Sequence, residues 1–410
     1  MSTSNNLFSI FRVQGQTPVY MVGLGHGAIH WVGMVVYVLL PYIRQDLGLS
    51  FVEAGTLVAI FHISSTVANI GSGLTVDITG RRVLFQVISV AVGGVSLIIF
   101  GLTANYLILA AMIALIGIAN NFWHPAAIAF LSTQYPNNRG YVLSIHALGA
   151  NVGDALAPLA VGTLLGWITW QQVAVVNALP VFVVSLLLLL IVLPKDSLAR
   201  DKTKRTMGFR EYVSGLGGMV KDKAVMGLSL MAAFRTAAQV GLFTFLPLYF
   251  VDVLKASPVV MGTGMMAMQV AGVIAAPIAG AASDRIGQRP IVIMGTTGTT
   301  IIIAALTFID NELMYITCIA VLGLCLYAIR PVVHSWLMHM VPDHLGGSAT
   351  SLMFGIQSAL AASMPIIGGI IADTYGLTSV FYFIAATMLI SNLIVLILPK
   401  TSPTRVAPAE

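Results

Sequence analysis

The feature that most constrains this chain is a series of twelve long apolar stretches. Each is long enough to cross the hydrocarbon core of a bilayer as a helix, which takes about 20 residues. A membrane barrel would instead show alternating segments of about ten residues. The stretches lie at roughly 17–40, 52–74, 84–103, 106–133, 140–164, 171–193, 224–251, 258–281, 290–309, 313–340, 347–372 and 377–398. The sequence therefore predicts an all-α polytopic membrane protein with twelve transmembrane helices.

Composition excludes the main alternatives. The chain is 58% hydrophobic and 9% charged, whereas soluble domains average about 45–50% and about 25%. Too few charges are present to cover a water-soluble enzyme, and disorder needs the opposite balance. The basic residues lie in short gaps rather than in a stripe, so no nucleic acid is expected as a partner. The N-terminus carries no pattern of a removable signal peptide.

Chemical motifs of enzymes are missing from the sequence. It contains no Walker loop, GxSxG or HExxH motif, so neither an ATPase nor another enzyme is predicted. The two cysteines, Cys318 and Cys325, share one apolar stretch and would lie about 10 Å apart along a helix, too far for a disulfide. No cofactor and no bound metal are expected.

Lysine and arginine placement predicts the orientation. With a cytoplasmic N-terminus, 16 of the 20 basic residues fall on the cytoplasmic side, as the positive-inside rule requires. Both termini are then cytoplasmic. The basic segment 194–223 falls midway, so we expect a six-helix bundle over 1–193, a cytoplasmic linker over 194–223, a second bundle over 224–400 and a tail over 401–410.

The two halves carry the same loop pattern. After the second and the eighth stretch, four residues recur at an offset of 207 positions, namely Gly73, Asp77, Gly80 and Arg82, matched by Gly280, Asp284, Gly287 and Arg289. Glycines permit close approach of helices, and the aspartate could accept hydrogen bonds from a helix N-terminus or from the arginines. These residues are predicted to form a clasp that gates the cytoplasmic side. The alternative is a tight turn with positive-inside arginines.

The motif GxxxDxxGRR at 73–82, which recurs as GxxxDxxGQR at 280–289, resembles the signature loop of the major facilitator superfamily. The resemblance covers the whole chain and implies two pseudo-symmetric six-helix bundles. Shorter stretches are similar to the fosmidomycin-resistance family of drug exporters, namely Gly25-His26, Phe122-Trp123-His124-Pro125, Gly149-Ala-Asn151-Val-Gly153 and Ala372-Asp373. His30 and Ala126 stand where that family is expected to carry acidic residues.

Ionisable residues inside the spans are costly and are functional candidates by default. Arg235 and Arg330 lie in the middle of their stretches, and a planar guanidinium suits carboxylates, phosphates and phosphonates. Asp154 is the one carboxylate deep within a stretch. The arginines are predicted to bind an anionic substrate, or else to be held by backbone carbonyls. Asp154 is predicted to carry protons, or else to form a structural hydrogen bond.

Histidines add a further set of candidates. His26 and His30 are four residues apart and share a helix face, and each can take a proton near neutral pH. With His124 and Asn151 they are predicted to line the substrate site, and His30 also to exchange protons with Asp154. Buried structural histidines are the alternative. A metal site is not expected, because no cysteine or carboxylate lies nearby in sequence.

The sequence thus predicts a secondary active transporter whose arginines and acid face a shared chamber and work by alternating access. Family resemblance favours proton-coupled export of a small anionic or drug-like molecule across the inner membrane, by a monomer. Two alternatives are proton symport of an organic acid and transport of a metal chelate or siderophore. A non-transporting sensor on the same fold would carry extra soluble domains.

Overall fold

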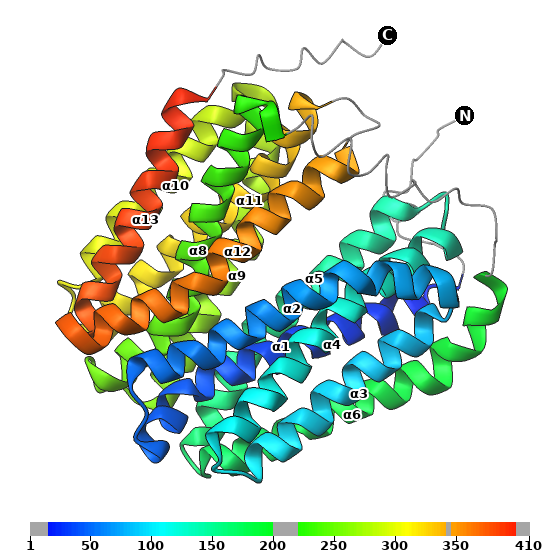
Figure 1. Cartoon of the computed structure of the whole chain (residues 1–410), viewed down its shortest axis with the longest axis horizontal. Helices are drawn as coiled ribbons and strands as arrows, with labels where there is room; N and C mark the ends of the chain where they lie inside the picture. Colours follow the sequence, from blue (N-terminus) through cyan, green and yellow to red (C-terminus); the bar gives the residue numbers. More distant parts are fainter. Residues whose placement is uncertain (1–14, 200–219, 342–345, 399–410) are drawn as a thin grey trace, which may run out of the picture. The chain divides into compact units, whose positions relative to one another are not determined.

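The described structure is helical throughout. A computed structural model describes residues 15–199, 220–341 and 346–398. Within these ranges twelve helices are long and apolar enough to cross a membrane, and no strand is formed (Figure 1). In chain order they are α1 (Thr17–Leu47), α2 (Phe51–Thr79), α3 (Arg82–Gly101), α4 (Tyr106–Gln134), α5 (Arg139–Leu165), α6 (Trp170–Leu187), α8 (Lys223–Asp252), α9 (Pro258–Ile286), α10 (Gln288–Leu306), α11 (Glu312–Met340), α12 (Gly346–Tyr375) and α13 (Leu377–Ile397). The predicted all-α polytopic fold is confirmed.

Several helices outrun the apolar stretches that predict them. The first stretch predicts a helix over 17–40, whereas α1 continues through Pro41 and Arg44 to Leu47. Helix α6 continues as a π-helical turn, η2 (Leu188–Val192), and a 3-10 segment, η3 (Leu193–Ala199). Polar residues are compatible with these last turns because a helix longer than the hydrocarbon core ends in the polar interface.

Side-chain caps fix where several helices begin. The Asn105 side chain accepts hydrogen bonds from two backbone N–H groups in the first turn of α4. Thr169 and Gln172 form a reciprocal capping box at the start of α6. Ser257 caps α9, and Pro258 occupies its first position. Such caps satisfy N–H groups that have no partner within the helix.

Equivalent helices of the two halves pack in equivalent ways. Helix α3 packs against α4 and α6, and its counterpart α10 packs against α11 and α13. The same pairwise packing in both halves is what an internal sequence repeat predicts.

The described residues group into two compact units. The first unit contains 15–36, 64–157 and 168–199, and the second contains 37–63, 158–167 and all described residues from 220 onward. The end of α1 and the start of α2 therefore belong with α8–α13. The sequence-based division at 194–223 stays a prediction.

Polar contacts explain why the α1–α2 connection joins the second unit. Arg44 donates from Nη2 to Asp252 Oδ2 of α8 at 2.8 Å. The Asp373 carboxylate of α12 accepts from the backbone N–H groups of Phe51 and Val52 at 2.8 and 2.9 Å. An aspartate at this place caps α2 and complements its dipole. These contacts fasten one end of the α1–α2 hairpin to α8 and α12.

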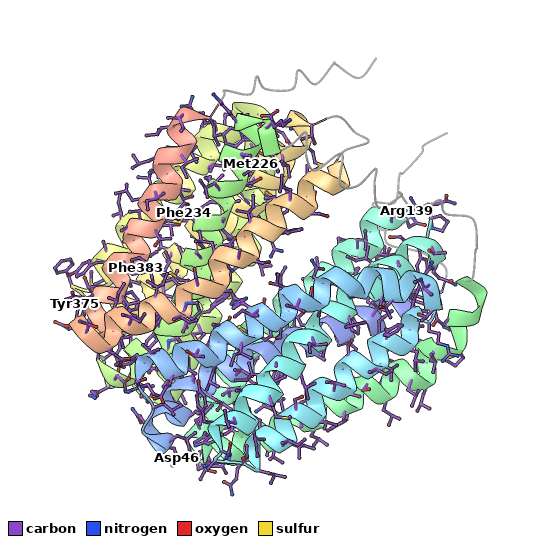
Figure 2. All side chains as sticks on the ribbon, in the orientation of Figure 1. Asp46, Arg139, Met226, Phe234, Tyr375 and Phe383 are labelled. Atoms are coloured by element: carbon purple, nitrogen blue, oxygen red, sulfur yellow. The ribbon has the colours of Figure 1, made fainter. Side chains whose placement is uncertain are left out.

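Large apolar side chains project outward along the helices (Figure 2). Exposed examples occur in both units and include Ile78, Leu102, Leu107, Leu179, Phe308 and Ile397. On a water-soluble protein so much exposed apolar surface would cause association. Around a membrane protein the same surface is covered by lipid tails.

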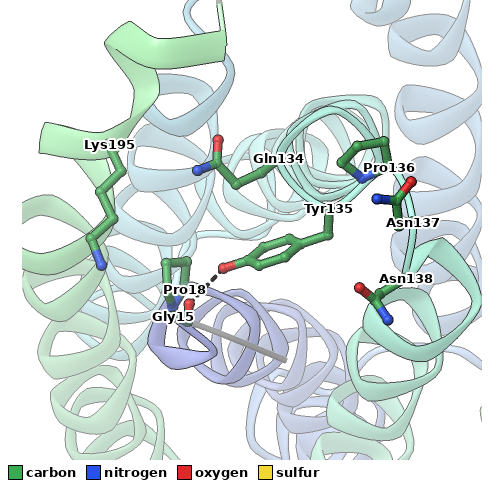
Figure 3. A pocket seen from close by; sticks show the side chains of 8 residues that line it. All are labelled: Gly15, Pro18, Gln134, Tyr135, Pro136, Asn137, Asn138 and Lys195. Atoms are coloured by element: carbon green, nitrogen blue, oxygen red, sulfur yellow. Dashed lines mark hydrogen bonds between the residues drawn. The ribbon is translucent and has the colours of Figure 1, made fainter. Parts of the chain in front are cut away.

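A hollow with a mixed polar and apolar lining lies beside the start of α1 in the first unit (Figure 3). It has a volume of about 390 Å³ and is lined by Gly15, Pro18, 134–138 and Lys195. The Tyr135 hydroxyl donates to the Gly15 carbonyl at 2.7 Å. Burial raises the pKa of Tyr135, so the phenol keeps its proton and donates across the physiological range.

Candidate functional site

Four histidines and one carboxylate gather inside the first unit. Helix α1 supplies His26 and His30, α4 supplies His124, and α5 supplies His146 and Asp154. These residues are up to 128 positions apart in sequence. Their assembly depends on how α1 crosses α4 and α5.

Glycines on both helices let α1 and α5 cross closely. A Cβ at Gly149 would overlap the carbonyl oxygen of Gly23, and one at Gly153 would overlap that of Gly27. Helix packing through small residues spaced four apart is common in membranes. At Gly25, a Cβ would overlap the ring of Trp123 on α4. The crossing brings the backbones themselves into contact, so side chains next to the glycines meet those of the neighbouring helix.

His26 is fixed by the backbone of α5. Its Nδ1 lies 2.7 Å from the carbonyl oxygen of His146. The two rings stack with centroids 3.8 Å apart at 14°, and both residues are buried. The indole N–H of Trp123 donates to Nε2 of His146 at 3.2 Å. Because a carbonyl oxygen can only accept, the hydrogen of His26 is on Nδ1.

His124 is fixed in the same way within α4. Its Nδ1 lies 2.8 Å from the carbonyl oxygen of Asn120 and so also carries a hydrogen. The Nε2 atoms of His26 and His124 are 3.3 Å apart. In both rings Nδ1 donates to a carbonyl oxygen, and the Nε2 atoms of the two rings therefore face each other.

His30 and Asp154, the two residues predicted to couple protons, are in contact. His30 Nδ1 lies 3.0 Å from Asp154 Oδ1, and both side chains are about a quarter exposed, at 27% and 23%. The His30 ring also packs edge-on against His26, with centroids 4.7 Å apart. Asn151, the remaining polar candidate on α5, is exposed. The predicted proton-coupling residues thus form one hydrogen-bonded group.

The two intramembrane arginines lie in the second unit. Arg235 on α8 is 5% exposed and donates from Nη2 to the carbonyl oxygen of Leu326 at 3.0 Å. Its Nε is buried and has no hydrogen-bond partner among the described residues. Arg330 on α11 is exposed and is close enough to repel Arg235 and His334 electrostatically. Both arginines and His334 belong to the second unit, whereas Asp154 belongs to the first.

The repeated loop motif is explained in part by backbone geometry. Gly80 and Gly287 have φ values of 63° and 90°, a region that favours glycine because it has no Cβ. The two glycines occupy equivalent turns at the ends of α2 and α9. By contrast, a Cβ at Gly73 or Gly280 would meet no atom within 4 Å. Close helix approach does not account for those two glycines in this structure.

Both motif arginines bind neighbouring helices. Arg82 donates from Nη1 to Thr133 Oγ1 on α4 at 2.8 Å. Arg289 donates from Nε to the carbonyl oxygen of Val395 at 3.2 Å and from Nη2 to that of Leu396, at the end of α13. A cation suits the negative end of a helix dipole. Asp284 is exposed, and the side chain of Asp77 lies outside the described part. The gating role of all eight motif residues stays a prediction.

Sequence reasoning missed two members of the histidine cluster. His146 and Trp123 were not predicted to belong to the site. The His146 ring stacks on His26, and the indole N–H of Trp123 donates to His146. Trp123 directly precedes His124 in a motif already singled out, which was the available signal. For His146 no periodicity points to its partner, because the contact arises from the α1–α5 crossing.

An apolar hollow adjoins the same crossing. It has a volume of about 460 Å³, within the size of sites for drug-like ligands, and lies between α1, α5 and α6 in the first unit. Its lining includes Leu24, Trp31, Val152, Leu156 and Val184. Trp31 donates from its indole N–H to Asn177 on α6 at 2.9 Å. The first unit thus offers an apolar surface beside a polar cluster.

Twelve helices long enough to span a membrane, repeated packing in two halves and ionisable groups inside the spans are typical of membrane transporters. The chain belongs to the Major Facilitator Superfamily, whose family model matches residues 22–272 and 250–410. It is a multi-pass protein of the inner membrane and moves small molecules.

Curated relatives are multidrug resistance proteins. The chain is 25% identical over 365 residues to the multidrug resistance protein MdtG of Klebsiella pneumoniae (strain 342), which covers 87% of each chain. It is also 25% identical over 382 residues to MdtG of Enterobacter lignolyticus (strain SCF1), covering 88% of this chain and 89% of the relative.

Solved structures share the fold. A bacterial homologue of the human lysosomal transporter Spinster, in an inward-facing and occupied conformation, matches with a TM-score of 0.75 at 16% identity, covering 92% of this chain and 94% of that one. The nucleoside transporter NupG matches with a TM-score of 0.77 at 12% identity, covering 92% and 98%. Together the matches confirm the transporter fold predicted from the sequence.

Proposed function

We propose that this transporter exports a small anionic or drug-like molecule in exchange for protons, by alternating access. The observation that carries the proposal is the 3.0 Å contact between His30 and Asp154 inside the first unit. A carboxylate and an imidazole in contact within a span form a natural proton site, since either group can hold the proton.

The groups around this pair favour one exchangeable proton rather than several. His26, His124 and His146 lie next to it on α1, α4 and α5. Several cations in so small a volume would repel one another. Protonation of the pair would therefore be sensitive to any change in how α1 lies against α5.

Arg235 and Arg330 support an anionic substrate. Guanidinium groups stay charged at physiological pH and present N–H groups in a planar fork. The buried Nε of Arg235 and the exposed Arg330 leave donors for carboxylate, phosphate or phosphonate oxygens. Within the first unit, the apolar hollow beside Trp31 supports a drug-like substrate with apolar surface, and the multidrug resistance relatives support export.

We infer that both termini are cytoplasmic and that the repeated loops gate that side. Arg82 and Arg289 hold helix neighbours through hydrogen bonds that one conformation makes and another would break. The Asp252 and Asp373 contacts of the α1–α2 connection would then lie on the opposite side of the membrane.

Transport in proteoliposomes with an imposed pH gradient tests the proposal. A phosphonate drug and a neutral drug of similar size serve as candidate substrates, and their flux is measured with the gradient in each direction. Export by antiport predicts substrate movement opposite to proton movement. Movement in the same direction as protons would instead establish symport.

Asp154→Asn identifies the coupling residue. The variant should bind substrate but lose the dependence of flux on the pH gradient, because an amide cannot exchange a proton in this range. Asp310→Asn, in the exposed connection between α10 and α11, is the matched control and should behave as the unmodified chain. Gradient-driven flux that is unchanged in Asp154→Asn would refute the proton role.

A further inference from the structure

The hydrogen bonds of His26, His30 and His124 indicate which class of ligand these three histidines could bind. His26 and His124 each present Nδ1 to a backbone carbonyl oxygen, of His146 and Asn120 respectively. A neutral imidazole has one N–H group and one lone pair. Since Nδ1 donates in both rings, each Nε2 carries the lone pair when the rings are neutral.

These two lone pairs point into the same space. The Nε2 atoms are 3.3 Å apart, and two acceptors at that distance repel unless a cation lies between or beside them. Metal–nitrogen bonds of about 2.0–2.1 Å at a tetrahedral zinc ion place two ligand nitrogens about 3.3 Å apart. The observed separation therefore equals the spacing of two imidazoles on one such ion.

A third ring completes a ligand set. One ring nitrogen from each of His26, His30 and His124 lies within 4.8 Å of the other two. The Nδ1 of His30 faces the Asp154 carboxylate at 3.0 Å, and a histidine that binds a metal typically donates its other N–H to a carboxylate or carbonyl. Each of the three rings has such an acceptor, which is a backbone carbonyl for His26 and His124 and the Asp154 carboxylate for His30.

The surroundings hold the rings in place without an ion. His26 is 5% exposed and stacks on His146, and His30 and His124 are half-buried. The rings come from α1 and α4, whose approach is fixed where Gly25 meets Trp123. Three ligands and an accessible remaining position are typical of zinc sites that also take water or an anion.

We propose that His26, His30 and His124 bind one divalent transition-metal ion of the zinc class through their ring nitrogens. Neutral imidazoles suit zinc, cobalt, nickel and copper, whereas magnesium and calcium require oxygen ligands. Protons compete for the same lone pairs, so binding weakens on acidification. The sequence alone predicts no metal site, because no cysteine or carboxylate lies near His26 and His30 in sequence.

Metal titration of the purified full-length protein tests this site. The chain, carrying a tag without histidine and stripped of metal, is titrated with Zn²⁺ by calorimetry and with Co²⁺ by visible absorption. One ion per chain is expected, with the intense absorption of a tetrahedral cobalt–nitrogen site. Ca²⁺ and Mg²⁺ should not compete.

Variants assign the ligands. His124→Asn and His30→Asn should each weaken Zn²⁺ binding at least tenfold, while His62→Asn and His334→Asn, which alter histidines outside the cluster, should not. Asp154→Asn should weaken binding about tenfold, as is usual for a partner of a metal-ligating histidine. Folding of each variant is checked by its elution profile and thermal unfolding. Because two ligand variants are made, the test still stands if one of them does not fold.

Failure to bind Zn²⁺ saturably, or equal affinity in folded His124→Asn and His30→Asn, would overturn the site and favour a proton shared between His26 and His124. Binding is measured at equilibrium without a gradient or transported drug. Its failure is therefore distinguishable from failure of proton-coupled export, which is read from flux alone.

Discussion

At the scale of single residues, the first unit is organised by ring nitrogens whose hydrogens are assigned by their partners. The spacing of His26 and His30 already indicated a shared helix face, and the structure adds what each ring faces. Carbonyl oxygens and the Asp154 carboxylate settle which nitrogen donates. The two proposals use the same rings, which hold a proton in one and a metal ion in the other, and this shared use links them.

Trp123 tests how much the orientation of His146 contributes to stability. Trp123→Phe keeps most of the buried ring and removes the N–H that donates to His146 Nε2. An unsatisfied buried acceptor costs about 1–3 kcal/mol, so thermal unfolding in detergent should occur at a lower temperature. Trp167→Phe is the control, since Trp167 is 85% exposed. Equal unfolding temperatures for both variants would contradict this account.

Arg235 tests the preference for anions. Arg235→Lys keeps the charge but loses the planar fork that donates to Leu326 O. Hydrogen bonds to charged groups are worth about 1.5–3 kcal/mol, so affinity for an anionic ligand should fall about tenfold or more. Affinity for a neutral drug should change little, and Arg139→Lys at the exposed start of α5 should alter neither. A uniform loss for both ligands would point to a packing role.

At the scale of helices, the apolar stretches predicted well that each helix exists and predicted poorly where it ends. All twelve helices appear, but α1 extends seven residues past its apolar stretch. Hydropathy reports only the part of a helix inside hydrocarbon, whereas caps and polar contacts set its ends. Asp373, for example, caps α2 across 322 sequence positions. No window along the chain contains that information.

The α1–α5 crossing is tested by one added methyl group. Gly149→Ala forces α1 and α5 apart, because the Cβ would overlap the Gly23 carbonyl. Overpacking costs about 1–3 kcal/mol, and the separation should also weaken Zn²⁺ binding and transport. Gly140→Ala on the same helix has open space around its Cβ and should leave both properties intact. A silent Gly149→Ala would show that the helices adjust freely.

At the scale of the whole molecule, the internal repeat was readable from the sequence and the composition of the compact units was not. The 207-residue offset predicted equivalent halves, and the α3 and α10 packing pairs agree. The α1–α2 connection joins α8 and α12 through Arg44 and Asp373. The sequence shows that charged residues such as Arg44 and Asp373 need partners, but it does not identify the residues that they contact.

Membrane orientation is predicted for the entire chain. In a background with Cys318 and Cys325 replaced by serine, Ala104→Cys lies between α3 and α4 and Asn137→Cys between α4 and α5. With cytoplasmic termini, a membrane-impermeant maleimide should label Ala104→Cys on intact cells and Asn137→Cys only after permeabilisation. The reverse pattern would invert the topology.

One consequence of the bond between the His26 ring and the carbonyl of His146 concerns mechanics. The ring travels with α1, while its anchor is part of the α5 backbone. If α1 moves along α5, the His26 imidazole moves away from the His146 carbonyl oxygen and changes its orientation. Under both proposals, a movement of α1 along α5 would therefore be accompanied by release of the proton or metal ion that the His26 ring holds.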